Sequence, residues 1–144
     1  MRLPIVLAAV LLPLAAEAHD YEKGGIHVGD AWARAPIGLG TSTAGYLEIF
    51  EMDGKGDRLI GARSEMADRV ELHTHTQVDG VMRMRPLEAL EIKPMGGGDL
   101  QPGGHHLMIM GLKQTVKPGD RIPVTLIFEK AGEMPVRFTV RAKQ

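Results

Sequence analysis

The sequence predicts an all-β protein, a single domain built as an antiparallel β-sandwich. Three observations favour this fold class. Short segments that alternate apolar and polar residues recur at near-regular spacing along the chain. Turn signals rich in glycine, proline and aspartate separate these segments. No convincing amphipathic helix is visible beyond residue 18.

Residues 1–18 have the three parts of a secretory signal peptide. Arg2 gives a short basic start, residues 4–16 form an apolar run, and Ala16-Glu17-Ala18 supplies small residues around a cleavage point. The apolar run is shorter than the roughly 20 residues that a membrane-spanning helix needs, and no second candidate follows. We therefore expect an exported protein without a membrane span, whose mature chain begins at His19.

Residues 19–144 are expected to form one folded domain, because 126 residues lie within the usual size of a single domain. The sequence contains no cysteine, which excludes disulfides and also a lipid attached to a cysteine at the cleavage point. The stability of the domain must therefore come from packing. The formal net charge is -1 with both signs scattered, so a nucleic-acid partner is not expected.

The first part of the domain is expected to contain three strands. The polar residues 19–25 should form a loose N-terminus, and breaks rich in glycine and proline or aspartate follow the first two strands. The three expected strands cover residues 26–33, 43–51 and 58–64.

The next two strands, residues 69–76 and 81–85, should form a β-hairpin. Asp79-Gly80 lies between them, and this dipeptide is a strong signal for a tight hairpin turn. Because side chains alternate across a strand, the polar and apolar positions of each strand separate onto opposite faces.

Histidines and methionines share one face of this predicted hairpin. Alternation places His73 and His75 together on the first strand, and Met82 and Met84 together on the second. A four-residue loop, Gln77–Gly80, would set His73 opposite Met84, whereas a two-residue turn would set His75 opposite Met84. In either register the imidazoles and thioethers lie within reach across the strands.

The remaining chain should add four strands. A loop over residues 94–104, with two prolines and five glycines, precedes a strand in which His106, Met108 and Met110 share one face. The four expected strands cover residues 90–93, 105–111, 121–129 and 134–142.

The segment from His73 to Met110 is the candidate functional region. It holds four of the six histidines and five of the nine methionines of the chain. Imidazole and thioether donors suit copper(I), a soft ion, whereas zinc rarely takes methionine and calcium or magnesium prefer oxygen. A blue-copper site needs a cysteine thiolate, which this sequence lacks. The residues therefore predict a copper(I)-binding module.

Two functions of other classes remain open on these residues. A copper(II)-dependent oxidase or oxygenase would use His73, His75 and His106 as nitrogen ligands. A structural or adhesive sandwich would use the methionine-rich face to dock a protein partner, because methionine more often fills cores and adaptable surfaces than it binds metal.

The chain resembles a known family, the periplasmic copper chaperones called PCuAC. The spacing H-x10-M-x21-H-x-M is met by His73, Met84, His106 and Met108. The similarity extends over nearly the whole mature chain. The segments that carry it are Asp30–Ala35, Asp57–Ala62, Val70–His73, Val81–Pro86, Lys93-Pro94 and Gln101–Leu112.

The resemblance implies a cupredoxin-like or immunoglobulin-like sandwich that works as a non-enzymatic, monomeric copper(I) chaperone in the periplasm. Its ligands would be His73, Met84, His106 and Met108, with His75 and Met110 as secondary candidates. It would deliver copper toward the binuclear copper centre of cytochrome c oxidase, through subunit II or a Sco-type thiol protein. His75 could add affinity for copper(II), and His19 could bind copper through its amine and imidazole.

Overall fold

The computed structural model describes residues 20–37 and 40–142. The predicted signal peptide, residues 1–18, and His19 lie outside the described residues. All the regular secondary structure of the described part is β-strand. No helix long and apolar enough to cross a bilayer occurs in it. The strands are β1 (Tyr21–Lys23), β2 (Ile26–Arg34), β3 (Thr43–Glu51), β4 (Asp57–Arg63), β5 (Ala67–Val78), β6 (Val81–Pro86), β7 (Leu90–Ile92), β8 (His106–Leu112), β9 (Arg121–Phe128) and β10 (Gly132–Arg141).

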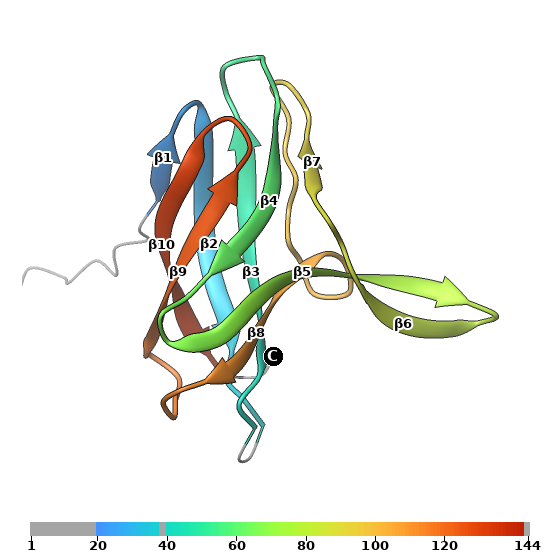
Figure 1. Ribbon diagram of the computed structural model, residues 1–144, viewed down its shortest axis with the longest axis vertical. Coiled ribbons are helices and arrows are strands. Elements are labelled where there is room, and N and C mark those ends of the chain that lie inside the picture. The colour runs from blue at the N-terminus through green and yellow to red at the C-terminus, as the bar shows by residue number, and fades with distance from the viewer. Residues whose placement is uncertain (1–19, 38–39, 143–144) are drawn as a thin grey trace, which may run out of the picture.

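The strands form one sheet that closes on itself (Figure 1). Along the sheet the order is β6-β5-β8-β3-β2-β10-β9-β4-β7, and an additional pairing between β4 and β5 completes a ring of seven strands. The predicted all-β class is confirmed. One detail differs from the antiparallel prediction, because β2 and β10 run parallel. They are distant in sequence, so no hairpin turn dictates their relative direction.

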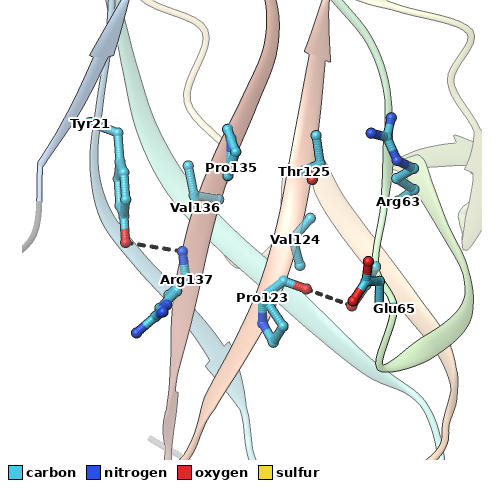
Figure 2. Close-up of a pocket in the computed structure, with 10 residues that line it drawn as sticks. Tyr21, Arg63, Glu65, Pro123, Val124, Thr125, Pro135, Val136 and Arg137 are labelled. Carbon is cyan, nitrogen blue, oxygen red and sulfur yellow. Dashed lines mark hydrogen bonds between the residues drawn. The ribbon is translucent and has the colours of Figure 1, made fainter.

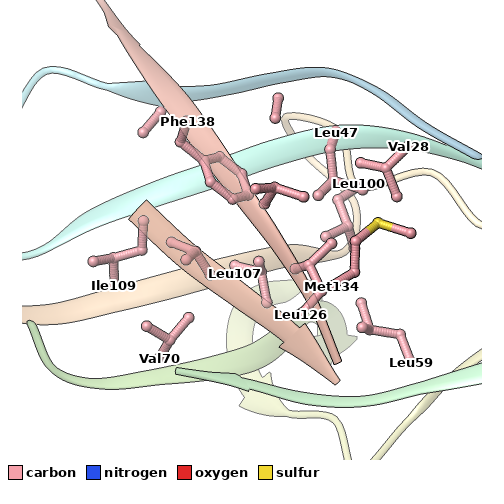
Figure 3. Packing of buried hydrophobic residues seen from close by; sticks show 14 of the residues in the cluster. Val28, Leu47, Leu59, Val70, Leu100, Leu107, Ile109, Leu126, Met134 and Phe138 are labelled. Carbon is pink, nitrogen blue, oxygen red and sulfur yellow. The ribbon is translucent and has the colours of Figure 1, made fainter. Parts of the chain in front are cut away.

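The interior of the ring is apolar. Figure 3 shows Phe138, Leu107 and Ile109 packed among side chains from several strands. In β8, Leu107 and Ile109 are buried in this core, while Met108 and Met110 on the alternate positions are only partly buried. The expected division of β8 into a core face and a histidine–methionine face is therefore confirmed.

The β5–β6 hairpin extends beyond the ring (Figure 1). The first part of β5, from Ala67 to His73, pairs with β8, and from His73 to Val78 it pairs with β6. All six residues of β6 are exposed. Because β6 ends the strand order, its second edge has no strand partner in the described chain. The hairpin thus leaves the ring at the position of His73.

The expected loose N-terminus contains a strand. Tyr21–Lys23 form β1, which pairs with β2 through Tyr21 and Val28. The intervening Gly24 and Gly25 both have positive φ, 57° and 80°, which is the backbone that a tight two-residue hairpin turn requires. The glycine pair was the signal in the sequence that this prediction missed.

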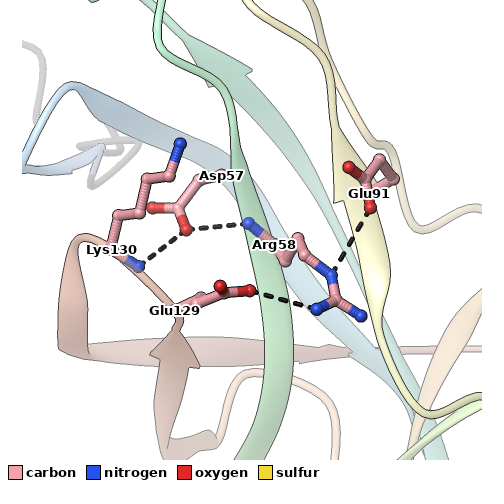
Figure 4. Close-up of polar contacts among 5 residues, drawn as sticks. All are labelled: Asp57, Arg58, Glu91, Glu129 and Lys130. Atoms are coloured by element: carbon pink, nitrogen blue, oxygen red, sulfur yellow. Dashed lines mark hydrogen bonds and ion pairs between the residues drawn. The ribbon is translucent and has the colours of Figure 1, made fainter.

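Asp57 and Arg58 fasten the end of the ring away from the hairpin (Figure 4). The Asp57 carboxylate accepts hydrogen bonds from three backbone N–H groups. The nitrogen–oxygen distances are 2.7 Å for Arg58, 2.8 Å for Lys130 and 2.9 Å for Ala131. The Arg58 guanidinium pairs with Glu91 and Glu129. The family-like segment that begins at Asp57 therefore has a structural role: it ties β4 to β7 and to the turn after β9.

Candidate metal centre

Three histidines meet where the hairpin leaves the ring. His73 on β5 and His106 on β8 are direct cross-strand partners, and their ring centroids lie 5.9 Å apart. His75, two residues further along β5, has its ring centroid 5.1 Å from that of His106. The strand parity read from the sequence thus brings these three imidazoles to one face.

The β5–β6 hairpin has the two-residue turn, formed by Asp79 and Gly80. Asp79 and Gly80 have φ values of 52° and 78°, so both occupy the left-handed region that this turn needs. In the resulting register His75 lies opposite Met84, and His73 lies opposite Pro86. His73 and Met84 are therefore diagonal neighbours, a relation that typically separates Cα atoms by about 7–8 Å.

Met108 continues the same face on β8. It lies between Glu71 of β5 and Ala44 of β3 in the register of the sheet, one side-chain position from His106. Met110 lies opposite Arg69, one further position away from the histidines. The geometry therefore brings Met108 to the histidine pair and leaves Met110 at the margin.

One ring nitrogen of His73 makes a hydrogen bond and the other has no partner in the described chain. Its Nε2 lies 2.9 Å from Oε2 of Glu71. Its Nδ1 is buried and has no hydrogen-bond partner among the residues that the structure describes. An unpartnered buried nitrogen costs free energy, so such atoms are rare in folded proteins, and a bound ion is one of the partners that can satisfy them. The residues present therefore fit a metal ion that takes a lone pair from His73.

His106 is oriented by a backbone carbonyl. Although it belongs to the outward face of β8, it is only 2% exposed, and its ring centroid lies 6.5 Å from that of Tyr46. Its Nδ1 lies 3.1 Å from the carbonyl oxygen of Gly104. Since a carbonyl only accepts, Nδ1 carries the proton and Nε2 keeps a lone pair.

Burial lowers the pKa of His106 below its usual 6.5, and the positive charges that His75, His73 and Arg34 can carry lower that pKa further. The hydrogen bond to Gly104 opposes this shift without cancelling it. His106 is therefore a neutral imidazole at neutral pH, which is the form that binds metal.

This pKa shift predicts that acid weakens the fold. As the pH falls from about 7.5 to 5.5, the unfolded chain takes up the His106 proton more readily than the folded chain, so the free energy of unfolding decreases. Urea unfolding of the wild type and of His106→Gln across this range measures the effect. The wild type should lose stability more steeply than the variant, and equal slopes would contradict the shift.

Two aromatic side chains, Trp32 and Tyr46, pack against each other next to His106. The rings of Trp32 and Tyr46 pack at 4.7 Å between centroids, and the Arg34 guanidinium lies 5.4 Å from the centre of the Tyr46 ring. Arg141 covers Trp32 and pairs with Asp30. The family-like segment that begins at Asp30 therefore supports the site from β2.

Not every histidine of the region joins the site. Nδ1 of His105 lies 2.9 Å from Oγ1 of Thr74, a residue between His73 and His75 whose side chain alternates to the other face of β5. Met82 lies opposite Gln77, nearer the tip of the hairpin. Within residues 20–37 and 40–142, no three side chains of the types histidine, aspartate and glutamate are grouped to hold an ion.

A separate pocket of about 420 Å³ lies between β1, β4, β9 and β10, next to Tyr21, Arg63 and Thr125 (Figure 2). No histidine or methionine lines it. This pocket is therefore separate from the candidate metal centre at the root of the hairpin.

Solved structures with a similar fold include PCuAC domains. The chain is 28% identical to the structure described as "Copper-bound PCuAC domain from PmoF2", with 87% of this chain and 99% of that chain covered and a TM-score of 0.74. It is 27% identical to CuI-DR1885 from Deinococcus radiodurans, with 88% and 81% covered and a TM-score of 0.61. The chain therefore has the fold of PCuAC domains.

The chain belongs to the LpqE-like family, whose model matches residues 26–140 under the description "Putative lipoprotein LpqE-like". A relative from Leifsonia xyli subsp. xyli (strain CTCB07), "Putative lipoprotein Lxx21020", is 32% identical over 134 residues, which cover 92% of this chain and 80% of that protein. The family name thus differs from the PCuAC name that the sequence suggested, while the fold agrees with it.

Proposed function

We propose that this protein is a copper(I) carrier whose ligands are His73, Met84, His106 and Met108. One observation carries the proposal. The imidazoles of His73 and His106 are cross-strand partners, and each has one ring nitrogen in a hydrogen bond and a lone pair on the other. They share a face with the thioethers of Met84 on β6 and Met108 on β8. The copper-bound state described for structural relatives supports it.

The donor set suits a carrier better than an enzyme. Two imidazoles and two thioethers are neutral and soft, so they hold copper(I) without fixing it through charge. Met84 is 51% exposed, which leaves one side of the site open to another protein. An incoming ligand can therefore bind copper before the donors on the hairpin leave.

His75 gives the site a place for copper(II). It lies between Met84 and His106, and its imidazole is a harder donor than a thioether. We propose that His75 joins the ligands when the bound copper is oxidised, so that the cargo is retained. The structural relatives are described as copper-bound and copper(I)-bound, and no observation favours the oxidase or oxygenase alternative.

The proposed receiver is a protein that offers thiolates. Cytochrome c oxidase subunit II and a Sco-type thiol protein have such ligands, and thiolates bind copper(I) more strongly than thioethers do. In the transfer, copper–thiolate bonds form as copper–thioether bonds break, and copper stays in the +1 state. We propose that the protein is exported to the periplasm, guided by residues 1–18, and acts there as a monomer.

An anaerobic copper(I) titration followed by X-ray absorption spectroscopy tests the proposal. We expect one copper(I) per chain, with two sulfur and two nitrogen scatterers around it. A site without sulfur scatterers would contradict the methionine ligands. A protein that binds no copper(I) would leave the structural or adhesive alternative.

A further inference from the structure

We propose that Glu71 is a positioning residue that fixes the tautomer of His73, so that His73 binds copper through Nδ1 while His106 binds it through Nε2. This inference rests on the proposed function and names the atoms of the same site. It makes the two central ligands chemically unequal, although they are direct partners across the sheet.

The first step is the contact between Glu71 and His73. Both side chains project from β5 on the same face, two residues apart, and Oε2 of Glu71 lies 2.9 Å from Nε2 of His73. An ionised carboxylate only accepts hydrogen bonds, so Nε2 of His73 must carry the proton. The lone pair of the ring then resides on Nδ1.

The second oxygen of Glu71 has a partner of its own. The Arg69 guanidinium lies 3.7 Å from Oε1, the carboxylate oxygen that His73 does not contact. Arg69 and His73 therefore hold the two oxygens of one carboxylate, which orients Glu71 toward the ring.

The second step concerns the other ring nitrogen of His73, which this arrangement leaves without a proton. Nδ1 of His73 is buried and has no partner within the described ranges of the chain. The hydrogen bond between Glu71 and Nε2 does not by itself explain why Nδ1 of His73 has no partner. Histidines that bind metal commonly donate their second ring N–H to a carboxylate or carbonyl, which fixes the tautomer and makes the ligating nitrogen more basic.

The third step is the opposite arrangement at His106. There the carbonyl of Gly104 accepts the proton of Nδ1, so the bare nitrogen is Nε2. The two histidines thus have different acceptors on different ring nitrogens.

Nitrogen-15 NMR of the copper-free protein reads the tautomers directly. We expect His73 as the Nε2–H form and His106 as the Nδ1–H form at neutral pH. Silver(I), a soft monovalent ion like copper(I), then identifies the ligating atoms through its coupling to nitrogen-15. We expect coupling to Nδ1 of His73 and to Nε2 of His106, while Nε2 of His73 keeps its proton.

Three variants separate positioning from general stability. Glu71→Ala should lose the defined Nε2–H signal of His73 and weaken copper(I) affinity about 10- to 100-fold, the usual cost of removing a partner of a metal ligand. Glu71→Gln keeps an oxygen acceptor and should restore the tautomer and most of the affinity. Glu88→Ala, which removes an exposed carboxylate between β6 and β7, should match the wild type.

The outcomes distinguish this inference from the proposed function. Silver coupling to Nε2 of His73, or unchanged affinity in Glu71→Ala, overturns the role of Glu71 while the copper site stands. Equal tautomers for both histidines in the copper-free protein also overturn it, and no ion is needed for that measurement. A protein that binds neither silver(I) nor copper(I) overturns both.

Discussion

Replacing Met84 and Met108 together by alanine is expected to abolish tight copper(I) binding and leave the fold intact. Removing even an outer partner of a ligand typically weakens metal affinity about 10- to 100-fold, so losing two direct ligands should cost at least about 1,000-fold. Neither side chain belongs to the apolar core, so the unfolding transition in urea should change little. Competition with a chelator of known copper(I) affinity measures the loss.

The hairpin offers a matched control for this experiment. Met82 lies on the same strand and face as Met84, with 58% of its surface exposed against 51%, but it is paired with Gln77 nearer the tip. Met82→Ala should therefore keep the wild-type copper(I) affinity within about 3-fold, since it removes no ligand or ligand partner. Full affinity in the double variant would contradict the ligand assignment. A loss in Met82→Ala as large as that in Met84→Ala would show that the hairpin binds copper less specifically.

Alternation alone predicted which side chains of the candidate site share a face, because these residues lie on strands. A period of two places His73 and His75 together, and separately His106 and Met108, whatever the rest of the fold does. The face could be predicted for the same reason, since Leu107 and Ile109 occupy the apolar alternate positions of β8. A one-residue slip would turn Leu107 and Ile109 away from the core, so the pattern is strongly constrained.

The register and the supporting contacts could not be predicted in the same way. Both turn lengths satisfy the parity of the hairpin, and only the backbone at Asp79 and Gly80 distinguishes them. The contact of His106 with Tyr46 joins β8 to β3, which are far apart in sequence. Alternation puts Glu71 on the same face of β5 as His73, but its hydrogen bond depends on side-chain rotamers that no periodicity specifies.

Phe138→Ala is expected to have the largest effect on stability. The ring of Phe138 is 0% exposed and lies against the backbone of Gly45, where an added Cβ would come within 3.0 Å of its Cε1. This contact leaves little room for neighbouring atoms to fill the space of a lost ring. Truncating a buried phenylalanine costs about 3–5 kcal/mol, including the cavity that remains.

Phe50→Ala is the matched control, because it deletes the same atoms from a ring that is 43% exposed. Its cost should be on the order of 0.5 kcal/mol, as for ordinary surface changes. Urea unfolding of both variants measures the difference. Because domains of this size are stable by only about 5–15 kcal/mol, Phe138→Ala should lower the midpoint markedly. Similar costs for the two variants would contradict the packing in Figure 3.

The same substitution tests whether the core supports the histidine–methionine face. Phe138 packs in the core that also contains Leu107 and Ile109 (Figure 3). These two residues alternate along β8 with His106 and Met108. A bound ligand stabilises a folded protein by about 4.1 kcal/mol at 1,000 times its dissociation constant. Copper(I) at that excess should therefore restore much of the stability that Phe138→Ala removes. It should restore none in a protein that also lacks Met84 and Met108, because there the ion has lost its ligands.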